Sequence, residues 1–515
     1  MCMKCKKILA TMASLTMMIS PMCVYADDTV YATDANGNSY NSIDSAWSAA
    51  CNGTTVYMSA DWNLNDRLVV PESTTVTIEM NGHQMNRNLE NKTISDGEVL
   101  YLSKNSTLNL NGDDNNSTEF NIKGFNLSGS ISNQTITSGG LVTGGSSDNG
   151  AGGIHMKKAS TLVLDKVAIA GNSSTQISRY GGGININNDD CQLYMTDSKI
   201  AYNFAKTGGG IYVEGENEII TMDNSEICFN YAYESGGGIN VYEDASYITM
   251  INGSKIYKNE AYGYGGGIYF NSPYCQLNSP DQTAEISDNC SKNYGGGGIC
   301  VSESTRGNTQ IIKNITFKSN SARESGGAIY TLQNNLTIEN CIFEDNSAED
   351  TGGAIYTNAK NTTIKNCTIQ YNYAYENGGG IYVFHDVDLN VSGKVVVTDN
   401  EKYDGTTDNV YLDYSFWSGA YISGTPESGS SIGINCDDER KVGINQTEDN
   451  GSIFSDGDEF KITYKDGELY KESGSVLGSI FGNANLGVAV VVIVGIIAVG
   501  VIALIISKKK NHGKA

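Results

Sequence analysis

Apolar and polar residues alternate along most of this sequence in runs of three to five residues. Ile220-Thr221-Met222 and Ile227-Cys228-Phe229 are two such runs, and residues such as Asn, Asp and Gly separate them. A period of two puts successive side chains on opposite faces, so the pattern predicts short β-strands with one buried face. Between the repeated motifs described below, no stretch is long enough, or has the 3.6-residue period, to predict an amphipathic helix.

Two motifs repeat in a common register through the middle of the chain. The first is Gly-Gly-small-Ile, and the second is an apolar residue followed three positions later by Asn. Each occurs nine times, and successive isoleucines are 26 to 31 residues apart. The isoleucines are Ile154, Ile184, Ile211, Ile239, Ile268, Ile299, Ile329, Ile355 and Ile381, and the asparagines are Asn172, Asn203, Asn230, Asn259, Asn289, Asn320, Asn346, Asn372 and Asn400.

A unit of this length buries too little surface to fold alone, so the repeats must stack on one another. The size suits one coil of a right-handed parallel β-helix with three short strands, and we expect an all-β rod about 60 Å long. A β-propeller is the other architecture considered, but its blades need four strands and 40 or more residues. The glycines suit a tight corner, and the nine asparagines are expected to form a structural ladder of amide hydrogen bonds between coils.

The two ends of the chain predict its compartment. Residues 1–26 have Lys followed by a short apolar run, which is typical of a signal peptide cleaved before Asp27, with an uncleaved anchor as the alternative. Residues 486–507 contain an uncharged stretch from Leu486 to Ile506 that is long enough to cross a bilayer, and a buried soluble helix is the alternative. The lysines of residues 508–515 predict a cytoplasmic tail, so the protein is expected to be a single-pass cell-membrane protein with an extracellular N-terminal ectodomain.

The intervening chain divides by how clear the repeat is. Residues 27–140 are expected to form an N-terminal cap, with Trp47 and Trp62, followed by degenerate first coils. Residues 141–405 hold the regular coils, and residues 406–472 are expected to supply the last coils and a C-terminal cap. Residues 473–485, rich in Gly, Ser and Asn, are expected to tether the rod to the membrane.

Charge excludes one class of partner. The whole chain has a formal charge of −24. Seven lysines lie in the predicted signal peptide and tail, so 27 cationic and 58 acidic residues remain between them, giving −31. A nucleic-acid partner is excluded, because phosphate binding requires clustered cations.

The paired motifs resemble a known family of surface proteins. Phe317-Lys318-Ser319-Asn320 followed by Gly326-Gly327-Ala328-Ile329 is similar to the FxxN and GGAI repeats of chlamydial polymorphic membrane proteins. The wider set resembles adhesin-like β-helix proteins of gut bacteria and methanogens. The resemblance implies the β-helix fold and a surface role of the adhesin type. The chlamydial family ends in an outer-membrane barrel and this sequence ends in an apolar stretch with lysines, so autotransport is not implied.

Tyrosines are the candidate ligand-binding residues. The residue after the motif isoleucine is expected to point outward, where a strip of rings can contact sugars or partner side chains, or instead stabilise its own sheet. These residues are Tyr212, Tyr269, Tyr330, Tyr356 and Tyr382.

Catalytic and metal sites find less support in the sequence. Within the regular coils the only Asp-Asp pair is Asp189-Asp190, and it is more typical of turn acids than of catalytic groups. His83, His155 and His385 are dispersed and predict no metal site, and no cofactor is expected. The exception considered is structural calcium at Asp456, Asp458 and Glu459, although their spacing completes no known loop.

Nine cysteines lie outside the predicted signal peptide. Cys341 and Cys367 each precede a ladder asparagine by five residues, so they are expected to stack on consecutive coils. Their spacing allows a disulfide, and two free thiols in a ladder are the alternative.

Together these features predict a membrane-anchored display module that binds a glycan or a host or cell-surface protein. A polysaccharide-cleaving β-helix enzyme, either a lyase or a glycoside hydrolase, is the alternative, and a passive spacer is the second alternative.

Overall fold

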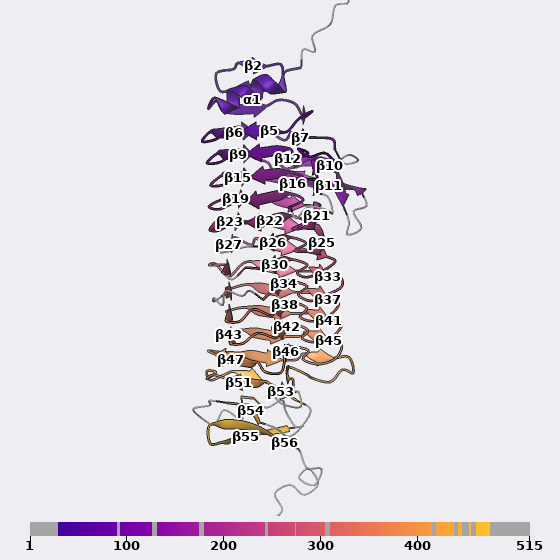
Figure 1. Cartoon of the computed structure of the whole chain (residues 1–515), viewed down its shortest axis with the longest axis vertical. Helices are drawn as coiled ribbons and strands as arrows, with labels where there is room; N and C mark the ends of the chain where they lie inside the picture. Colours follow the sequence, from indigo (N-terminus) through magenta and orange to yellow (C-terminus); the bar gives the residue numbers. More distant parts are fainter. Residues whose placement is uncertain are drawn as a thin grey trace, which may run out of the picture.

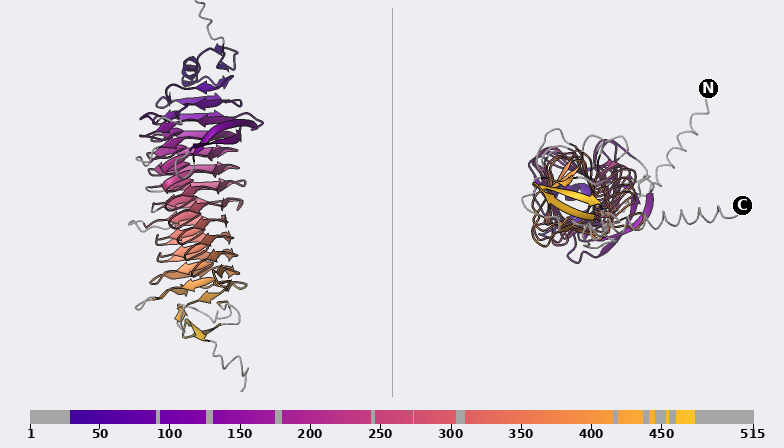
Figure 2. Two further views of the ribbon diagram at one scale, coloured as in Figure 1. Left: turned by 90° about the vertical axis from the view of Figure 1, so that its right-hand side faces the viewer. Right: turned by 90° about the horizontal axis from the view of Figure 1, so that it is seen from below.

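The computed structural model describes residues 29–473, except 90–92, 126–130, 175–179, 243–245, 273, 304–309, 415–418, 437–440, 445–452 and 455–459. It is a parallel β-solenoid of about 11 turns with almost no helix. Figures 1 and 2 show the coils stacked along one long axis in sequence order, from the N-terminal coils at the top of Figure 1 to the C-terminal coils at the bottom. The predicted all-β stacked architecture is confirmed for these residues.

Each regular coil contains four strands rather than the three expected. In the coil that follows Gly210 they are β22 (Ile211–Glu214), β23 (Glu218–Asp223), β24 (Glu226–Cys228) and β25 (Tyr231–Ser235). Corresponding strands of successive coils pair in parallel and form four sheets, which we call A, B, C and D. Within one coil the chain passes through sheet C, then A, then B and then D. The strands of sheet D are mostly two residues long, which is too short for alternation to reveal them.

Sheets C and D flank the glycine corner. The strands of sheet C are β5 (Leu68–Val70), β8 (Leu100–Leu102), β14 (Ile154–Met156), β18 (Ile184–Asn187), β22, β26 (Ile239–Val241), β30 (Ile268–Phe270), β34 (Ile299–Val301), β38 (Ile329–Thr331), β42 (Ile355–Thr357), β46 (Ile381–Val383), β50 (Val410–Leu412) and β53 (Ile434–Asn435). Those of sheet D are β13 (Ser146–Ser147), β17 (Ser173–Ser174), β21 (Phe204–Thr207), β25, β29 (Glu260–Ala261), β33 (Cys290–Ser291), β37 (Ser321–Ala322), β41 (Ser347–Ala348), β45 (Tyr373–Ala374) and β49 (Glu401–Lys402).

Sheets A and B complete the coil. Sheet B consists of β4 (Trp62–Asn63), β7 (Gln84–Asn86), β12 (Gly140–Thr143), β16 (Val167–Ala170), β20 (Lys199–Ala201), β24, β28 (Lys255–Tyr257), β32 (Glu285–Ser287), β36 (Thr316–Lys318), β40 (Ile342–Glu344), β44 (Thr368–Gln370), β48 (Val396–Thr398) and β52 (Ser431–Ile432). Sheet A consists of β1 (Ala32–Asp34), β2 (Ser39–Tyr40), β3 (Val56–Met58), β6 (Thr75–Glu79), β9 (Thr107–Asn111), β15 (Thr161–Asp165), β19 (Gln192–Thr196), β23, β27 (Ser246–Ile251), β31 (Cys275–Asn278), β35 (Gln310–Lys313), β39 (Leu336–Glu339), β43 (Thr362–Lys365), β47 (Asp388–Ser392), β51 (Tyr421–Ser423), β54 (Lys441–Gly443), β55 (Phe460–Lys465) and β56 (Glu468–Ser473).

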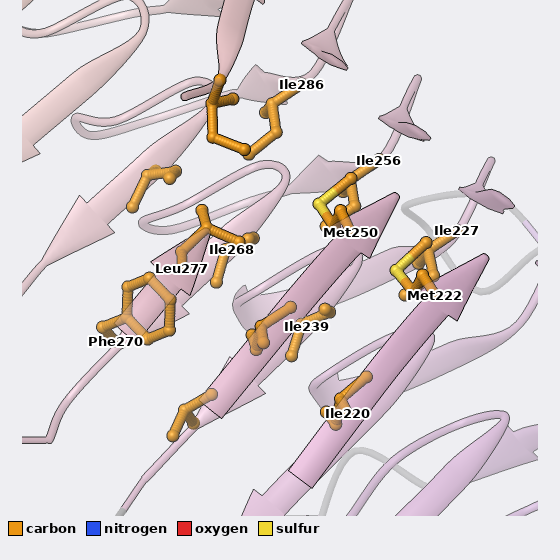
Figure 3. Close-up of a cluster of buried hydrophobic side chains, with 14 of the residues drawn as sticks. Ile220, Met222, Ile227, Ile239, Met250, Ile256, Ile268, Phe270, Leu277 and Ile286 are labelled. Carbon is orange, nitrogen blue, oxygen red and sulfur yellow. The ribbon is translucent and has the colours of Figure 1, made fainter. Parts of the chain in front are cut away.

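The core is a column of inward-facing side chains from sheets A, B and C. Every motif isoleucine is buried and lies in register with the next, as with Ile211, Ile239 and Ile268. Figure 3 shows Ile220, Met222 and neighbouring apolar side chains filling the interior of successive coils. Burying such a side chain contributes about 2 kcal/mol, so the stack is stabilised by repetition of one small contact set.

The glycine motif is required by the corner between sheets D and C. Gly236 has a φ of +68°, which favours glycine. A Cβ on Gly237 would lie 2.4 Å from the carbonyl oxygen of Gly266 in the next coil. Consecutive coils therefore touch through their backbones at this corner.

The N-terminal end of the rod is covered by the helix α1 (Ile43–Cys51). The hydroxyl of Ser42 caps it by accepting from the backbone N–H of Ser45. Trp47 packs against the core, and the buried Trp62 donates its indole N–H to the carbonyl of Tyr31. The region thus contains the two tryptophans assigned to a cap, followed by coils that lack the Gly-Gly motif.

A hairpin interrupts the early coils. Its strands, β10 (Thr118–Phe125) and β11 (Ile131–Ser138), pair antiparallel with each other and with no other described strand. It stands out from the side of the rod in Figure 1, and its apolar residues pack on the outer face of sheet B.

At the C-terminal end β55 and β56 form an antiparallel hairpin that joins sheet A through β54. The predicted signal peptide (1–26), transmembrane helix (486–507) and tail (508–515) lie outside the described residues, as does the tether apart from Ser473. Within the part of the chain that the structure describes, no helix is both long and apolar enough to span a membrane.

Candidate binding surface along the solenoid

The ladder asparagines form a continuous chain of buried hydrogen bonds. In one step, both the backbone N–H and the side-chain Nδ2 of Asn230 donate to Oδ1 of Asn259, each at 3.0 Å. Nδ2 of Asn230 also donates to the carbonyl of Ile200 in the preceding coil at 2.8 Å. The same pairing joins Asn172, Asn203, Asn230, Asn259, Asn289, Asn320, Asn346, Asn372 and Asn400.

The ladder continues one step beyond the repeat. Oδ1 of Asn409 accepts from the backbone N–H of Asn400 at 3.0 Å and from its Nδ2 at 2.9 Å. The motif spacing does not identify Asn409, because it lies only nine residues after Asn400 and directly before β50. A short loop brings it back over the last rung, where it accepts hydrogen bonds from Asn400.

The predicted tyrosines lie on one line along the outside of sheet C, and three of them stack. Tyr330 and Tyr356 have ring centroids 4.8 Å apart, and Tyr356 and Tyr382 lie 5.5 Å apart, with interplanar angles of 6° and 5°. Tyr411 of β50 extends the stack by a further 5.5 Å. We call these four residues the tyrosine column. Because the rings cover each other's faces, they offer a ligand their edges and hydroxyl groups rather than flat ring faces.

The other two predicted tyrosines differ from the column. The sequence predicts that Tyr212 points outward into solvent, but it is only 1% exposed, with the ring of Tyr242 stacked at 6.4 Å. Tyr269 is linked to the column only indirectly, by the ring of Tyr264. The centroid of that ring lies 6.5 Å from the ring of Tyr269 and 5.8 Å from the ring of Tyr330. Tyr264 lies in a turn before the glycine motif, so the spacing rule for strand positions did not select it.

A row of carboxylates runs beside the column. Glu324, Asp350 and Glu376 occupy the same turn on three consecutive coils. The backbone N–H of Asp350 donates to the carbonyl of Glu324 at 3.1 Å, and that of Glu376 donates to the carbonyl of Asp350 at 2.8 Å. We call these residues the acidic row. Repulsion by Asp350 together with burial raises the pKa of Glu376, and burial and Asp350 raise the pKa of Glu324. The acidic row was missed because it lies in turns, outside the alternating strands.

The hydroxyl groups of Tyr356 and Tyr382 stay protonated at neutral pH, because the pKa of each is raised. Burial, with Asp413 and Asp350 nearby, raises the pKa of Tyr356 to about 12. Burial, with the negative charge of Asp413 nearby, also raises the pKa of Tyr382. Asp413 in turn contacts Nδ1 of His385 at 2.9 Å. The surface thus combines neutral phenols with carboxylates that accept hydrogen bonds.

The remaining predicted residues lie elsewhere. Asp189 pairs with Lys158 at 2.8 Å, which lowers the pKa of Asp189 and suits a turn acid, and Asp190 accepts from Asn217. Among the described residues no group of three or more His, Cys, Asp or Glu side chains is placed to hold a metal ion. The calcium candidates Asp456, Asp458 and Glu459 lie outside the described residues.

Cys341 and Cys367 lie on consecutive coils as expected, but they are not joined. Both are free thiols, and the backbone N–H of Cys341 donates to the sulfur of Cys367 at 3.5 Å. Each thiol also donates to a nearby backbone carbonyl, at 3.3 Å for Cys341 and 3.2 Å for Cys367. The ladder of thiols is the arrangement present, because these contacts satisfy both groups without a covalent bond.

The comparison with known families concerns the fold. Residues 280–462 match the family of the right handed beta helix region. No curated protein matches the chain. The match and the parallel solenoid support a right-handed β-helix repeat, and they identify no ligand. The likeness to polymorphic membrane proteins and adhesins stays a prediction.

One buried carboxyl makes stability depend on pH. Glu218 of β23 is fully buried, and within the described residues its Oε1 has no partner while Oε2 accepts from Ser246 at 3.3 Å. Burial raises the pKa of Glu218 to about 8. Below the ordinary pKa of 4.5 the carboxyl is protonated in both the folded and the unfolded chain. Between 4.5 and 8 only the unfolded chain ionises, so folding stability falls as the pH rises.

We expect Glu218→Gln to stabilise the protein at alkaline pH and to leave it nearly unchanged at pH 5. The gain in the free energy of unfolding at pH 9 should be about 2–4 kcal/mol, after allowing for relaxation around the buried charge. Urea denaturation of the full-length chain at both pH values measures it, with the exposed Glu216→Gln as control. Equal effects of Glu218→Gln at pH 5 and pH 9 would contradict the assignment.

Proposed function

We propose that the protein is a membrane-anchored, cell-surface rod that binds a glycan or a cell-surface partner through the tyrosine column. The observation that carries the proposal is the stack of Tyr330, Tyr356 and Tyr382 on consecutive coils. A rigid parallel sheet holds these side chains in place before binding, so little conformational entropy is lost when a ligand binds. Tyrosine combines apolar ring edges with a hydroxyl group, and it is common at binding surfaces.

The acidic row supports a ligand rich in hydroxyl or amide groups. Glu324, Asp350 and Glu376 are acceptors beside the column, and the phenols can both donate and accept. An anionic ligand is disfavoured, because the chain carries a formal charge of −24 and the row adds carboxylates beside the site. We therefore favour neutral glycans or polar protein segments.

The proposed location rests on the two ends of the sequence. The uncharged stretch from Leu486 to Ile506 is about one bilayer thickness long as a helix, and lysines follow it. In this arrangement residues 27–485 face the outside of the cell, and the rod carries the tyrosine column away from the membrane.

The acidic row also raises a second candidate function, cleavage of a polysaccharide. Asp350 lies beside Glu376 on the next coil, and repulsion by Asp350 together with burial raises the pKa of Glu376, as in a general acid. Glycosidases, however, use two carboxyl groups in different roles, placed about 5–9.5 Å apart so that substrate atoms fit between them. The acidic row instead repeats one turn position on consecutive coils, so we favour binding over hydrolysis by this pair.

Replacing Tyr330, Tyr356 and Tyr382 together with Ser is expected to reduce binding at least tenfold, because the edges and hydroxyl groups of the rings are removed from one surface. Binding of the full-length chain in mild detergent to a glycan array, and to cells, measures this. The matched control replaces Tyr247, Tyr274 and Tyr371, three exposed tyrosines outside sheet C, with Ser. The column is rejected as the binding surface if the variant of Tyr330, Tyr356 and Tyr382 still binds, whether or not the control variant loses binding.

A further inference from the structure

A second candidate site lies on the same side of the rod as the tyrosine column, nearer the N-terminal end. It is a cavity of about 170 Å³ between the outer face of sheet C and the turns that follow sheet D. Its lining includes Thr207, Tyr212, Glu234, Asn240, Tyr242 and Tyr269, from the coils that contain β21 to β30. In other proteins an apolar cavity of about 150 Å³ holds one benzene molecule. A space of this size therefore suits a single six-membered ring.

Two buried polar atoms at this cavity lack a partner among the described residues. Asn240 is 2% exposed and Thr207 is 7% exposed, yet Oδ1 of Asn240 and Oγ1 of Thr207 have no hydrogen-bond partner. Nδ2 of Asn240 donates to the carbonyl of Ser235 at 3.2 Å, which fixes the amide and leaves its oxygen as the free acceptor. Each such atom costs about 1–3 kcal/mol when it is left unsatisfied. Both residues therefore suit a ligand that brings hydroxyl groups.

We propose that this cavity binds one neutral hexopyranose ring of a glycan. The inference rests on the proposed role in glycan binding and names a sugar-sized subsite for it. Ring hydroxyls donate to Oδ1 of Asn240 and exchange a hydrogen bond with Oγ1 of Thr207. The apolar face of the sugar packs against the tyrosine side chains that line the cavity.

The charge of the site selects a neutral sugar over an acidic one. Glu234 lines the cavity, and its Oε1 pairs with Nζ of Lys206 at 3.2 Å. The opposite charges of this pair offset each other, and the described residues that line the cavity include no Lys or Arg that could pair with a uronate or sialate carboxyl group. Such a group would also lie beside Oδ1 of Asn240, an acceptor that cannot donate to it.

Saturation-transfer NMR with the full-length chain in mild detergent tests the proposal. The probes are free glucose, galactose, mannose and N-acetylglucosamine, with glucuronate as the acidic comparison. We expect transfer to at least one neutral sugar and none to glucuronate. Thr207→Val, which removes the hydroxyl at nearly constant shape, and Asn240→Leu should each weaken that binding at least fivefold. Thr221→Val, on the outer face of sheet A, should leave it unchanged.

A stability measurement keeps the test independent of folding defects. Without sugar, Thr207→Val should raise the melting temperature, because an unsatisfied buried hydroxyl is removed. No transfer from any neutral sugar, or transfer that both variants leave intact, would overturn the proposal and assign the cavity to water alone.

The variant of Tyr330, Tyr356 and Tyr382 separates the two proposals. If it loses array binding while no sugar binds the cavity, only the subsite fails; if it binds the array normally while Thr207→Val blocks the sugar, only the column fails.

Discussion

Replacing Asn259 with Ala is expected to lower the free energy of unfolding by about 3–5 kcal/mol. The side chain is fully buried and makes four hydrogen bonds. Its Oδ1 accepts from the backbone N–H and from Nδ2 of Asn230, and its Nδ2 donates to the carbonyl of Ile227 and to Oδ1 of Asn289, all at 2.8–3.0 Å. Alanine leaves these partners buried and unsatisfied, which costs more than the hydrogen bonds contribute in net terms.

Chemical denaturation of the full-length chain measures this loss. Asn358→Ala is the matched control, because Asn358 is an exposed asparagine on the same solenoid. Asn259→Asp keeps the shape but cannot donate and brings in a charge, so it should destabilise the protein about as much as alanine. A change at Asn259 no larger than the change at Asn358 would show that the ladder does not stabilise the coils.

The second large effect is expected at the glycine corner. Gly237→Ala should destabilise the protein by about 3 kcal/mol. The new Cβ would lie 2.4 Å from the carbonyl oxygen of Gly266 and 2.5 Å from that of Glu260. Both are backbone atoms held by the neighbouring coil, so they cannot move aside without separating two rungs.

Gly253→Ala separates crowding from backbone strain. Gly253 has a φ of +78°, and no described atom lies within 4 Å of the position that a methyl group on its Cα would take. Alanine there therefore meets only the cost of the left-handed conformation, which is about 1–2 kcal/mol. Melting temperatures of the two variants give the comparison, and a larger loss at Gly253 than at Gly237 would contradict close packing of the coils at the corner.

The stacked β-coils were predictable because one physical requirement is repeated. Each motif isoleucine must face the interior, and a shift by one residue would expose it, so equal spacing in sequence implies register in space. Ile211, Ile239 and Ile268 meet that condition. The fourth strand of each coil was not predictable, since two residues such as those of β37 carry no period.

Part of the candidate site follows from the repeat. Tyr330, Tyr356 and Tyr382 follow motif isoleucines, and Glu324, Asp350 and Glu376 each lie four residues after a ladder asparagine, so both rows have a constant register. The acidic residues lie in turns, outside the alternating pattern that predicts strands, and the neighbours of Tyr264 depend on how its turn closes. The burial of Tyr212 likewise depends on Tyr242, which comes from the adjacent coil after the strand ends.

The most direct test of the proposed binding function is to incubate the full-length chain with the glycans that it binds on the array. Two quantities are measured, the amount of glycan bound and the number of glycosidic bonds cleaved. We expect saturable retention that the Ser variant of Tyr330, Tyr356 and Tyr382 loses, with no more new reducing ends or unsaturated uronides than in buffer. Steady release of either product by the unaltered chain, abolished by Asp350→Asn or Glu376→Gln, would contradict a binding role and establish a polysaccharide-cleaving enzyme.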